Sequence, residues 1–182
     1  MNTISSVLDV TNFGVVGDGT TNNTKKIAEV IGELKKLGGG TVYFPPGEYV
    51  TGSIILGDNM TLYLEGGATI LGSADPEDYP MITKEDLEGY NREGHTGLVA
   101  ARNAKNITVT GRGTLDGRGY NWWSNPKNEQ RPRAFQPIMC ENVRLSGISI
   151  INSAMWTVHP MCLRHVTIDG ISIKNPADSP NT

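Results

Sequence analysis

Residues 142–150 read NVRLSGISI, and residues 165–173 repeat the phrase as HVTIDGISI. Each copy has a polar residue, a short alternating strand, a glycine turn and a second short strand. Two earlier segments have the same pattern: NMTLYLEGGATI at 59–70 and NITVTGRGTLDG at 106–117. The glycines of the two later copies, Gly147 and Gly170, lie 23 residues apart. A period of this length, with several short β segments per turn, is typical of a parallel β-solenoid.

The apolar positions of the two later copies match one for one. They are Val143, Leu145, Ile148 and Ile150 in the first copy and Val166, Ile168, Ile171 and Ile173 in the second. We expect these side chains to face inward and to stack on one another in consecutive turns. Gly66 and Gly111 lie 45 residues apart, which we interpret as two periods. From Gly111 to Gly147 we expect one period plus an insertion over residues 120–133.

One segment, residues 24–37, has the pattern of an amphipathic helix. Its apolar face consists of Ile27, Val30, Ile31, Leu34 and Leu37. Asn23 or Thr24 can cap its start, and the glycines at 38–40 end it. Because the helix precedes the first predicted strand, residues 41–44, we expect it to cover the N-terminal end of the solenoid. Open strand edges at such an end would otherwise recruit other chains.

These elements predict an all-β fold with a single β-helix domain over residues 1–182. Residues 1–40 hold the N-terminal segment and the capping helix, and residues 41–182 hold the turns of the β-helix. No covering element follows the last predicted strand, which ends at Lys174. We therefore expect the domain to be truncated at its C-terminal end, with the missing C-terminal half of the same protein as its partner.

Composition and charge limit the function classes. Hydrophobic residues make up 37% and charged residues 19%, and no apolar run approaches the ~20 residues of a membrane helix. The N-terminus lacks a basic end followed by an apolar run, so the chain is either cytoplasmic or secreted with its leader removed. Between Gly111 and Lys174 there are eight Lys or Arg against four Asp or Glu, in a chain of net charge −3. This balance favours an anionic ligand over bulk nucleic acid.

Neither a metal nor a cofactor is predicted. Cys140 and Cys162 have no metal-ligand spacing, and we interpret both as buried small hydrophobes. The sequence has no serine-hydrolase elbow, phosphate loop or metal-binding helix motif. Asp18, Asp116 and Asp169 lie at predicted turns, where aspartate side chains bind the backbone.

Several motifs, in order along the chain, resemble glycoside hydrolase family 28, the polygalacturonases and related pectin-degrading enzymes. They are NFGVVGDGTTNNTKKI at 12–27, GGGTVYFPPGEYVTGSI at 38–54, TLDGRG at 114–119, Trp122 with Trp123, Arg131 with Pro132, NSAMWTVHP at 152–160 and SPNT at 179–182. The resemblance implies a right-handed parallel β-helix that cleaves α-1,4-galacturonosyl bonds of pectin with inversion. Acidic polysaccharide or an oligogalacturonide is the implied partner, with no role for nucleic acid or a membrane.

The resemblance also bears on the catalytic residues. An inverting enzyme needs two carboxyl groups ~6.5–9.5 Å apart, with a water between them. In the family the first is the Asp of an Asn-Thr-Asp motif, and a paired Asp, a Gly-His-Gly turn and an Arg-x-Lys pair follow. Asn181 and Thr182 match the first two residues of that motif. We therefore expect no catalytic residue within the chain and no activity from it alone.

Seven residues are candidates for substrate binding. In WTVHP, alternation puts Trp156 on one face and His159 on the other, so one of them faces the core and the other solvent or the cleft. Asp178 could reach the floor of the cleft. The remaining candidates lie in the insertion: Trp122, Trp123, Arg131 and Arg133. This insertion is either the wall of a groove, where Arg can bind a carboxylate through two hydrogen bonds, or a loop folded over the core by its tryptophans.

Two other functions stay open. A short β-solenoid could bind acidic polysaccharide without cleaving it. A pectate lyase would share the fold but use calcium and an Arg base, and its unsaturated products would identify it.

Overall fold

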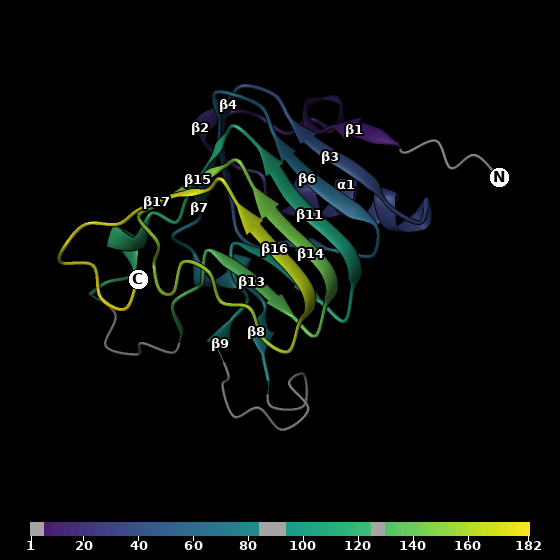
Figure 1. Cartoon of the computed structure of the whole chain (residues 1–182). Coiled ribbons are helices and arrows are strands. Elements are labelled where there is room, and N and C mark those ends of the chain that lie inside the picture. The colour runs from purple at the N-terminus through teal and green to yellow at the C-terminus, as the bar shows by residue number, and fades with distance from the viewer. Residues whose placement is uncertain (1–5, 84–93, 125–129) are drawn as a thin grey trace.

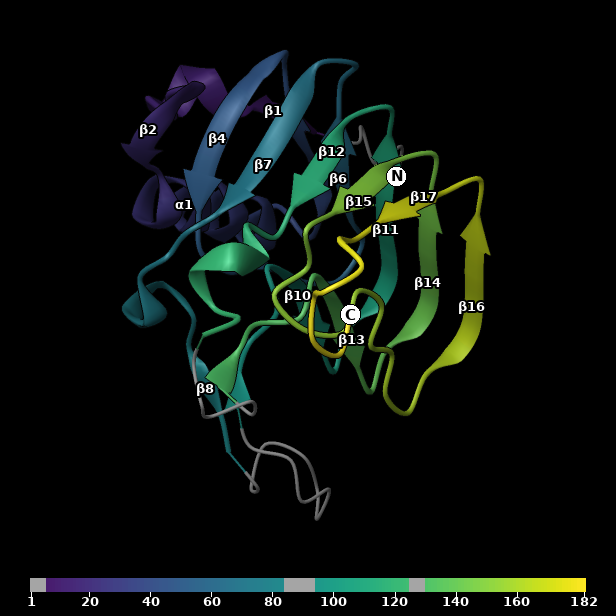
Figure 2. The same ribbon diagram turned by 90° about the vertical axis from the view of Figure 1, so that its left-hand side faces the viewer.

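Three parallel β-sheets run along the molecule, and each turn of the chain adds one strand to the first and to the second sheet, whereas the third sheet has strands in three of the turns (Figure 1). The structure is a computed structural model that describes residues 6–83, 94–124 and 130–182. The first sheet contains β1 (Val7–Asp9), β3 (Gly40–Phe44), β6 (Met60–Leu64), β11 (Lys105–Gly111), β14 (Glu141–Ser146) and β16 (Arg164–Asp169). The second contains β2 (Asp18–Asn22), β4 (Gly47–Thr51), β7 (Ala68–Gly72), β12 (Thr114–Asp116), β15 (Ser149–Ile151) and β17 (Ser172–Lys174), side by side in Figure 2. The third contains β5 (Ile54–Leu56), β10 (Val99–Arg102) and β13 (Phe135–Ile138).

The core is a set of columns in which each turn contributes one apolar side chain. One column runs through the first sheet in direct register: Val42, Leu62, Val109, Leu145 and Ile168. The first four members are fully buried. The predicted stacking of Val143 on Val166 and of Ile150 on Ile173 is confirmed by the register of the last two turns. The predicted parallel β-helix is therefore confirmed.

One part of the predicted repeat is wrong. The 45 residues from Gly66 to Gly111 do not form two turns, because Leu62 of β6 pairs directly with Val109 of β11. The excess lies in an insertion that leaves the second sheet after β7 and returns to the third sheet at β10. It contains a 3-10 turn, η2 (Pro76–Asp78), and a small antiparallel pair of β8 (Met81–Ile82) with β9 (Gly94–His95). Spacing alone cannot separate one long insertion from an additional turn.

The predicted helix is α1 (Thr24–Lys36), which packs on β3, β4 and β5 of the first full turn, at the N-terminal end of the solenoid (Figure 2). Its buried face is Ile27, Val30, Ile31 and Leu34. The capping helix is therefore confirmed. Within residues 1–40, β1 and β2 also join the first and second sheets.

The predicted cap of the helix is wrong in detail. The side chain of Asn23 is fully buried and binds the backbone of Val16 and Thr21 instead of the helix. The side chain of Asn22 accepts the hydrogen bond from Thr24 N, at 3.0 Å. The predicted end is correct, since the helix is followed by Gly38 with φ 83°.

A column of asparagines explains why each sequence copy begins with a polar residue. Asn59, Asn106 and Asn142 all have left-handed backbone, with φ of 58°, 59° and 56°. Asn106 Nδ2 donates to Asn59 Oδ1 at 2.7 Å, and Asn142 Nδ2 donates to Asn106 Oδ1 at 3.0 Å. His165 continues the left-handed corner in the next turn, with φ 56°. Asparagine suits this corner because it tolerates left-handed backbone and can bond to the turns on both sides.

Replacing Asn106 with alanine should therefore destabilise the protein by roughly 2–3 kcal/mol. Alanine loses both amide hydrogen bonds and strains the left-handed backbone. The Asn106→Gly variant loses the bonds but keeps the backbone, so we expect it to lose only about 1–2 kcal/mol. Urea unfolding followed by circular dichroism measures both variants. Equal stability of the alanine variant and the parent would mean that the column contributes nothing.

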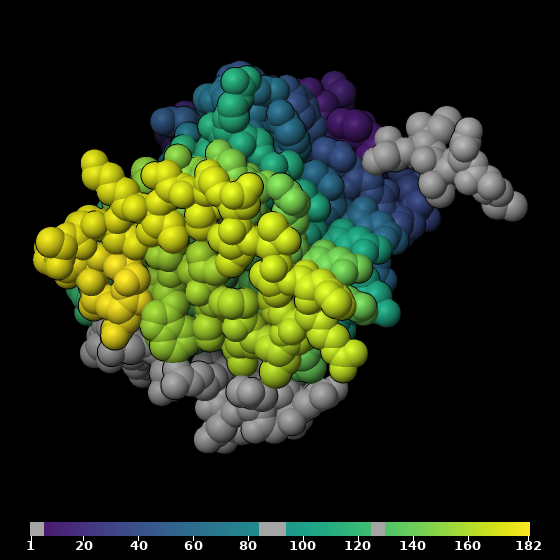
Figure 3. Space-filling model, in the orientation of Figure 1, coloured from purple at the N-terminus to yellow at the C-terminus, as the bar shows by residue number. Residues whose placement is uncertain are grey.

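The last turn forms the yellow-green face of Figure 3. Its stacking positions are partly exposed: Val166 is 42%, Ile168 is 44% and Ile173 is 49% exposed. Cys162, in the preceding loop, is also exposed, whereas Cys140 is buried. The prediction that both cysteines are buried is therefore wrong for Cys162. It occupies the left-handed corner that Met139 occupies one turn earlier, with φ of 53° and 50°, and not the buried position of Cys140.

Candidate functional site

Two isolated bridges extend the third sheet beyond β13, next to the segment that holds Trp156 and His159. Parallel bridges join Phe135 to Val158 and Ile138 to Met161. Gln136 and His159 therefore occupy equivalent positions in consecutive turns. The core side chains Phe135 and Val158 pack inward, so the residues that follow them point outward. His159 N donates to the carbonyl oxygen of Phe135 at 2.9 Å, which fixes this register.

Arg133, Trp156 and His159 form one cluster, named here the aromatic–cationic cluster. The ring centroids of Trp156 and His159 lie 4.5 Å apart at 56°, and the guanidinium carbon of Arg133 lies 5.5 Å from the centre of the Trp156 ring. Trp156 and His159 are half-buried, and Arg133 is buried. A guanidinium at this distance from an indole face is attracted by the ring quadrupole. The cluster therefore combines a positive charge, an imidazole and a large aromatic surface.

The predicted alternation of Trp156 and His159 is wrong. Alternation requires a continuous strand, and in this segment Val158 makes only an isolated bridge. The irregular backbone before it brings both rings to one side. No local pattern indicates this departure from a strand, because WTVHP has the composition of a short strand.

Arg131 is fully buried and binds the chain itself. Its Nη1 donates to the carbonyl oxygens of Ala154 and Pro180, each at 2.8 Å, and its Nη2 donates to Asn181 Oδ1 at 2.9 Å. Burial lowers the pKa of the Arg131 guanidinium, yet an arginine stays charged at neutral pH. These bonds connect the insertion to the segment that holds Asn181 and Thr182.

The two tryptophans of the insertion lie against the body of the protein. Trp122 is 4% exposed and lies edge-on to Tyr79, with ring centroids 5.5 Å apart, and to His95, at 6.1 Å. Trp123 is half-buried, and its Nε1 donates to the carbonyl oxygen of Ser153 at 3.2 Å. This is the arrangement expected of a loop folded over the core. Trp122 offers almost no surface to a ligand.

The segment after β17 folds back onto the turn that holds Ser153 and Thr157. Asn175 accepts from Ser153 N at 2.8 Å and donates to Thr157 Oγ1 at 2.9 Å. Thr182 Oγ1 and Ser179 Oγ share a hydrogen bond of 2.7 Å. Asp178 is exposed on this segment, as are Asn181 and Thr182. Asn181 and Thr182 therefore lie in a segment that is hydrogen-bonded to other parts of the chain.

Two other carboxylates bind backbone groups, as predicted, although they lie at strand ends and not in turns: Asp116 ends β12 and Asp18 begins β2. Asp116 Oδ1 accepts from Arg118 N at 2.8 Å and from Asn152 Nδ2 at 3.1 Å. Asp18 accepts hydrogen bonds from the backbone of Thr20 and Thr21, and these bonds hold its pKa below the usual range.

Within residues 6–83, 94–124 and 130–182, no group of three or more His, Cys, Asp and Glu side chains is placed to hold a metal ion. No helix in the described part of the chain is long and apolar enough to cross a membrane.

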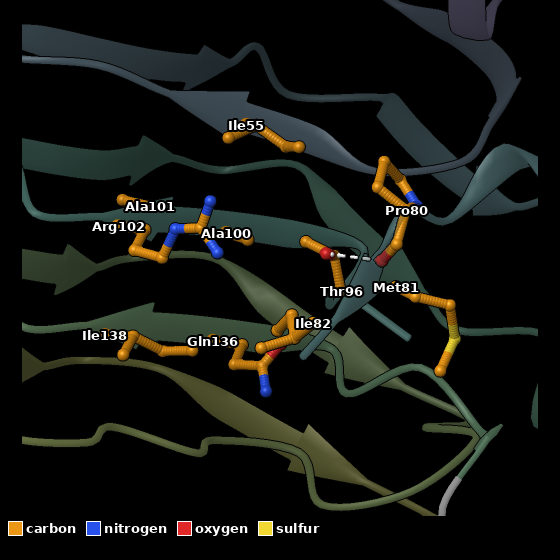
Figure 4. A pocket seen from close by; sticks show the side chains of 10 residues that line it. All are labelled: Ile55, Pro80, Met81, Ile82, Thr96, Ala100, Ala101, Arg102, Gln136 and Ile138. Carbon is orange, nitrogen blue, oxygen red and sulfur yellow. Dashed lines mark hydrogen bonds between the residues drawn. The ribbon is translucent and has the colours of Figure 1, made fainter. Parts of the chain in front are cut away.

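A cavity of about 90 Å³ lies between the β8–β9 pair and the outer face of the third sheet (Figure 4). Its walls are mostly apolar, and the labelled Arg102 and Gln136 provide polar groups. Gln136 Oε1 accepts from Gly97 N at 2.8 Å, and Thr96 Oγ1 donates to Pro80 O at 2.7 Å. Ligand pockets usually enclose about 300–1,000 Å³, so this cavity is too small for a sugar unit. Sequence reasoning missed Gln136 and Arg102, since neither lies in a recognisable motif.

Comparison with known proteins identifies the relatives of this chain. The model of the family described as "Rhamnogalacturonase A/epimerase, pectate lyase-like" matches residues 7–179. A protein of Vitis vinifera named "Probable polygalacturonase" is 35% identical over 182 residues, which cover 93% of this chain and 37% of the relative. The chain therefore spans little more than a third of the length of that curated relative.

Two solved structures have the same fold. The hyperthermoactive exopolygalacturonase of Thermotoga maritima superposes with a TM-score of 0.85 and 29% identity, over 97% of this chain and 48% of that one. The family 28 exopolygalacturonase of Yersinia enterocolitica superposes with a TM-score of 0.83 and 26% identity, over 97% and 40%. The chain is thus a right-handed parallel β-helix of the polygalacturonase type.

Proposed function

Since the chain belongs to the rhamnogalacturonase A/epimerase, pectate lyase-like family, we propose that it is the N-terminal portion of a polygalacturonase-like glycoside hydrolase. Its substrate in this proposal is the α-1,4-linked galacturonate chain of pectin, cleaved with inversion. The observation that carries the proposal is the aromatic–cationic cluster of Arg133, Trp156 and His159, in a chain that is 35% identical to a polygalacturonase.

The chemistry of the cluster suits a uronate polymer. Every galacturonate ring carries a carboxylate, which needs a cation or hydrogen-bond donors, and an apolar ring face, which packs on an aromatic side chain. His159 supplies a polar group and Trp156 supplies the aromatic surface, while the buried Arg133 holds its positive charge 5.5 Å from the centre of the Trp156 ring. The half-buried Trp156 and His159 remain accessible to such a ligand.

Cleavage needs groups beyond this cluster. We propose that Asn181 and Thr182 begin the Asn-Thr-Asp motif, and that the catalytic carboxyl groups lie in the part of the relatives that this chain does not span. Inversion then follows from one carboxylic acid that protonates the leaving oxygen and one carboxylate that activates water. Asp116 and Asp18 are engaged with backbone groups, and a lone exposed Asp178 has no paired acid in this scheme.

The test compares the 182-residue chain with the chain extended through the codons that follow in its gene. We expect the 182-residue chain to release no reducing ends from polygalacturonate, and the extended chain to release them with inverted configuration. Turnover by the 182-residue chain that disappears on replacing one of its own carboxylates would contradict the proposal. Calcium-dependent formation of unsaturated products would indicate a lyase instead.

A second candidate function is a β-solenoid that binds acidic polysaccharide without cleaving it. The same cluster favours it, because the three side chains can bind a uronate without any catalytic carboxyl group. An extended chain that binds oligogalacturonides and shows neither hydrolysis nor elimination would support this candidate.

A further inference from the structure

One buried side chain joins three segments that are far apart in the sequence. Arg131 lies in the insertion before β13, Ala154 in the loop after β15, and Pro180 with Asn181 in the segment after β17. The guanidinium of Arg131 donates to Ala154, Pro180 and Asn181, at 2.8–2.9 Å. The Arg131 side chain is fully buried, so solvent cannot take over these bonds.

The geometry requires an arginine. A guanidinium presents its N–H donors in one rigid plane, whereas the ammonium of lysine is a compact point charge on a flexible stem. Here one terminal nitrogen serves the carbonyl oxygens of Ala154 and Pro180, and the other serves Asn181 Oδ1. A charged donor makes shorter and stronger hydrogen bonds than a neutral one. Substitution by lysine therefore keeps the charge and loses part of the bonding.

The backbone at Asn181 has a specific conformation. Its φ of 59° is left-handed, which asparagine adopts more readily than most other residues with a side chain. The hydrogen bond from Arg131 holds the side chain of this residue in place. The direction of the chain after Asn181 depends on this left-handed backbone conformation.

We propose that Arg131 is a positioning residue that fixes the Pro180–Asn181–Thr182 segment. The inference rests on the proposed function only where it concerns catalysis, in that Asn181 and Thr182 open the catalytic motif. Arg131 does not touch substrate in this role. It acts by setting the direction in which the chain leaves Asn181, and a misplacement of about 1 Å at a reacting group can cost ~100-fold in rate.

A carboxypeptidase measures the anchoring without any need for activity. The enzyme removes Thr182 and then Asn181 from the 182-residue chain, and the initial release rate reports how often the segment detaches. We expect R131M to raise that rate at least ~10-fold, because all the bonds are lost, and R131K to raise it several-fold. The matched control is R112M, since the Arg112 side chain is 81% exposed in the turn between β11 and β12 and pairs with Glu65. Its release rate should stay within about twofold of the parent.

Two further measurements separate anchoring from general unfolding. Hydrogen exchange of β14 and β15 in the same samples should be unchanged in R131K. N181G keeps the left-handed backbone and loses a single bond, so its release rate should rise about threefold. In the double variant, R131M should raise the release rate by a smaller factor than it does in the parent, because one of its bonds is already lost. A release rate in R131K and N181G equal to that of the parent would overturn the proposal.

The catalytic part is tested in the extended chain. R131K should lower kcat about tenfold or more and leave KM within about threefold, because substrate contacts are intact. An equal loss in the R112M control would contradict a specific role. If the extended chain has no hydrolase activity at all, the proposed function fails, while the release assay still decides whether Arg131 anchors the segment.

Discussion

Replacing Gly111 with alanine is expected to destabilise the protein by roughly 3–5 kcal/mol, which lowers its melting temperature by roughly 6–20 °C. Gly111 ends β11 with a φ of +123°, a backbone conformation that alanine adopts only under strain. A Cβ built there would lie 2.0 Å from the carbonyl oxygen of Leu64 in the neighbouring turn. That oxygen already accepts hydrogen bonds from Arg112 N and Gly113 N, at 2.9 and 3.2 Å. The clash is with backbone on a paired strand, so no side-chain movement can relieve it.

Gly66 provides the matched control. It lies in the turn between β6 and β7, and a Cβ at this position has nothing closer than Arg112 Nε at 4.0 Å. Gly66→Ala should change stability by no more than about 0.5 kcal/mol. Thermal unfolding of both variants, followed by circular dichroism, makes the comparison. Equal melting temperatures would show that the turns of the solenoid can separate locally to admit a methyl group.

This clash also explains why the sequence repeat could be recognised. Gly147 occupies the corresponding corner one turn later, with φ +75°, and a Cβ there would lie 2.6 Å from the carbonyl oxygen of Gly111. Close contact between consecutive turns requires glycine at these corners, and inward packing requires apolar residues such as Leu145 and Ile168 beside them. Both demands hold in the consecutive turns of Gly111 and Gly147, so they leave a periodic pattern there. The parallel β-helix and its capping helix could therefore be predicted.

Features that depend on a single turn could not be predicted in the same way. The aromatic–cationic cluster arises because one loop departs from strand geometry just before Val158. The burial of Arg131 arises because its partners lie 23 and 49 residues away in the chain. No local pattern encodes contacts at such separations. Composition predicts exposed arginines in a loop, since a buried guanidinium needs partners that only the folded chain supplies.

Replacing Trp156 with alanine should raise the dissociation constant for an oligogalacturonide by about 10–100-fold. The change removes the aromatic surface proposed to pack on a sugar ring. It also removes the ring that lies 5.5 Å from the guanidinium of Arg133 and 4.5 Å from the imidazole of His159. Both polar side chains then lose the surface that orients them. Isothermal titration calorimetry with a size-defined oligogalacturonide measures the effect, and it needs no catalytic activity.

Two control variants make this result specific. Trp156→Phe keeps an aromatic face and should bind within about fivefold of the parent. Tyr63→Ala removes a half-buried aromatic residue from a stacked pair on the first sheet, where its ring lies 5.9 Å from that of Tyr43, and should leave binding unchanged. If Trp156→Ala binds as tightly as the parent, the ring does not contact the sugar. If Trp156→Ala binds as tightly as the parent and Arg133→Met abolishes binding, the affinity for the uronate comes from charge alone. Raising the salt concentration should then weaken the binding of the parent steeply.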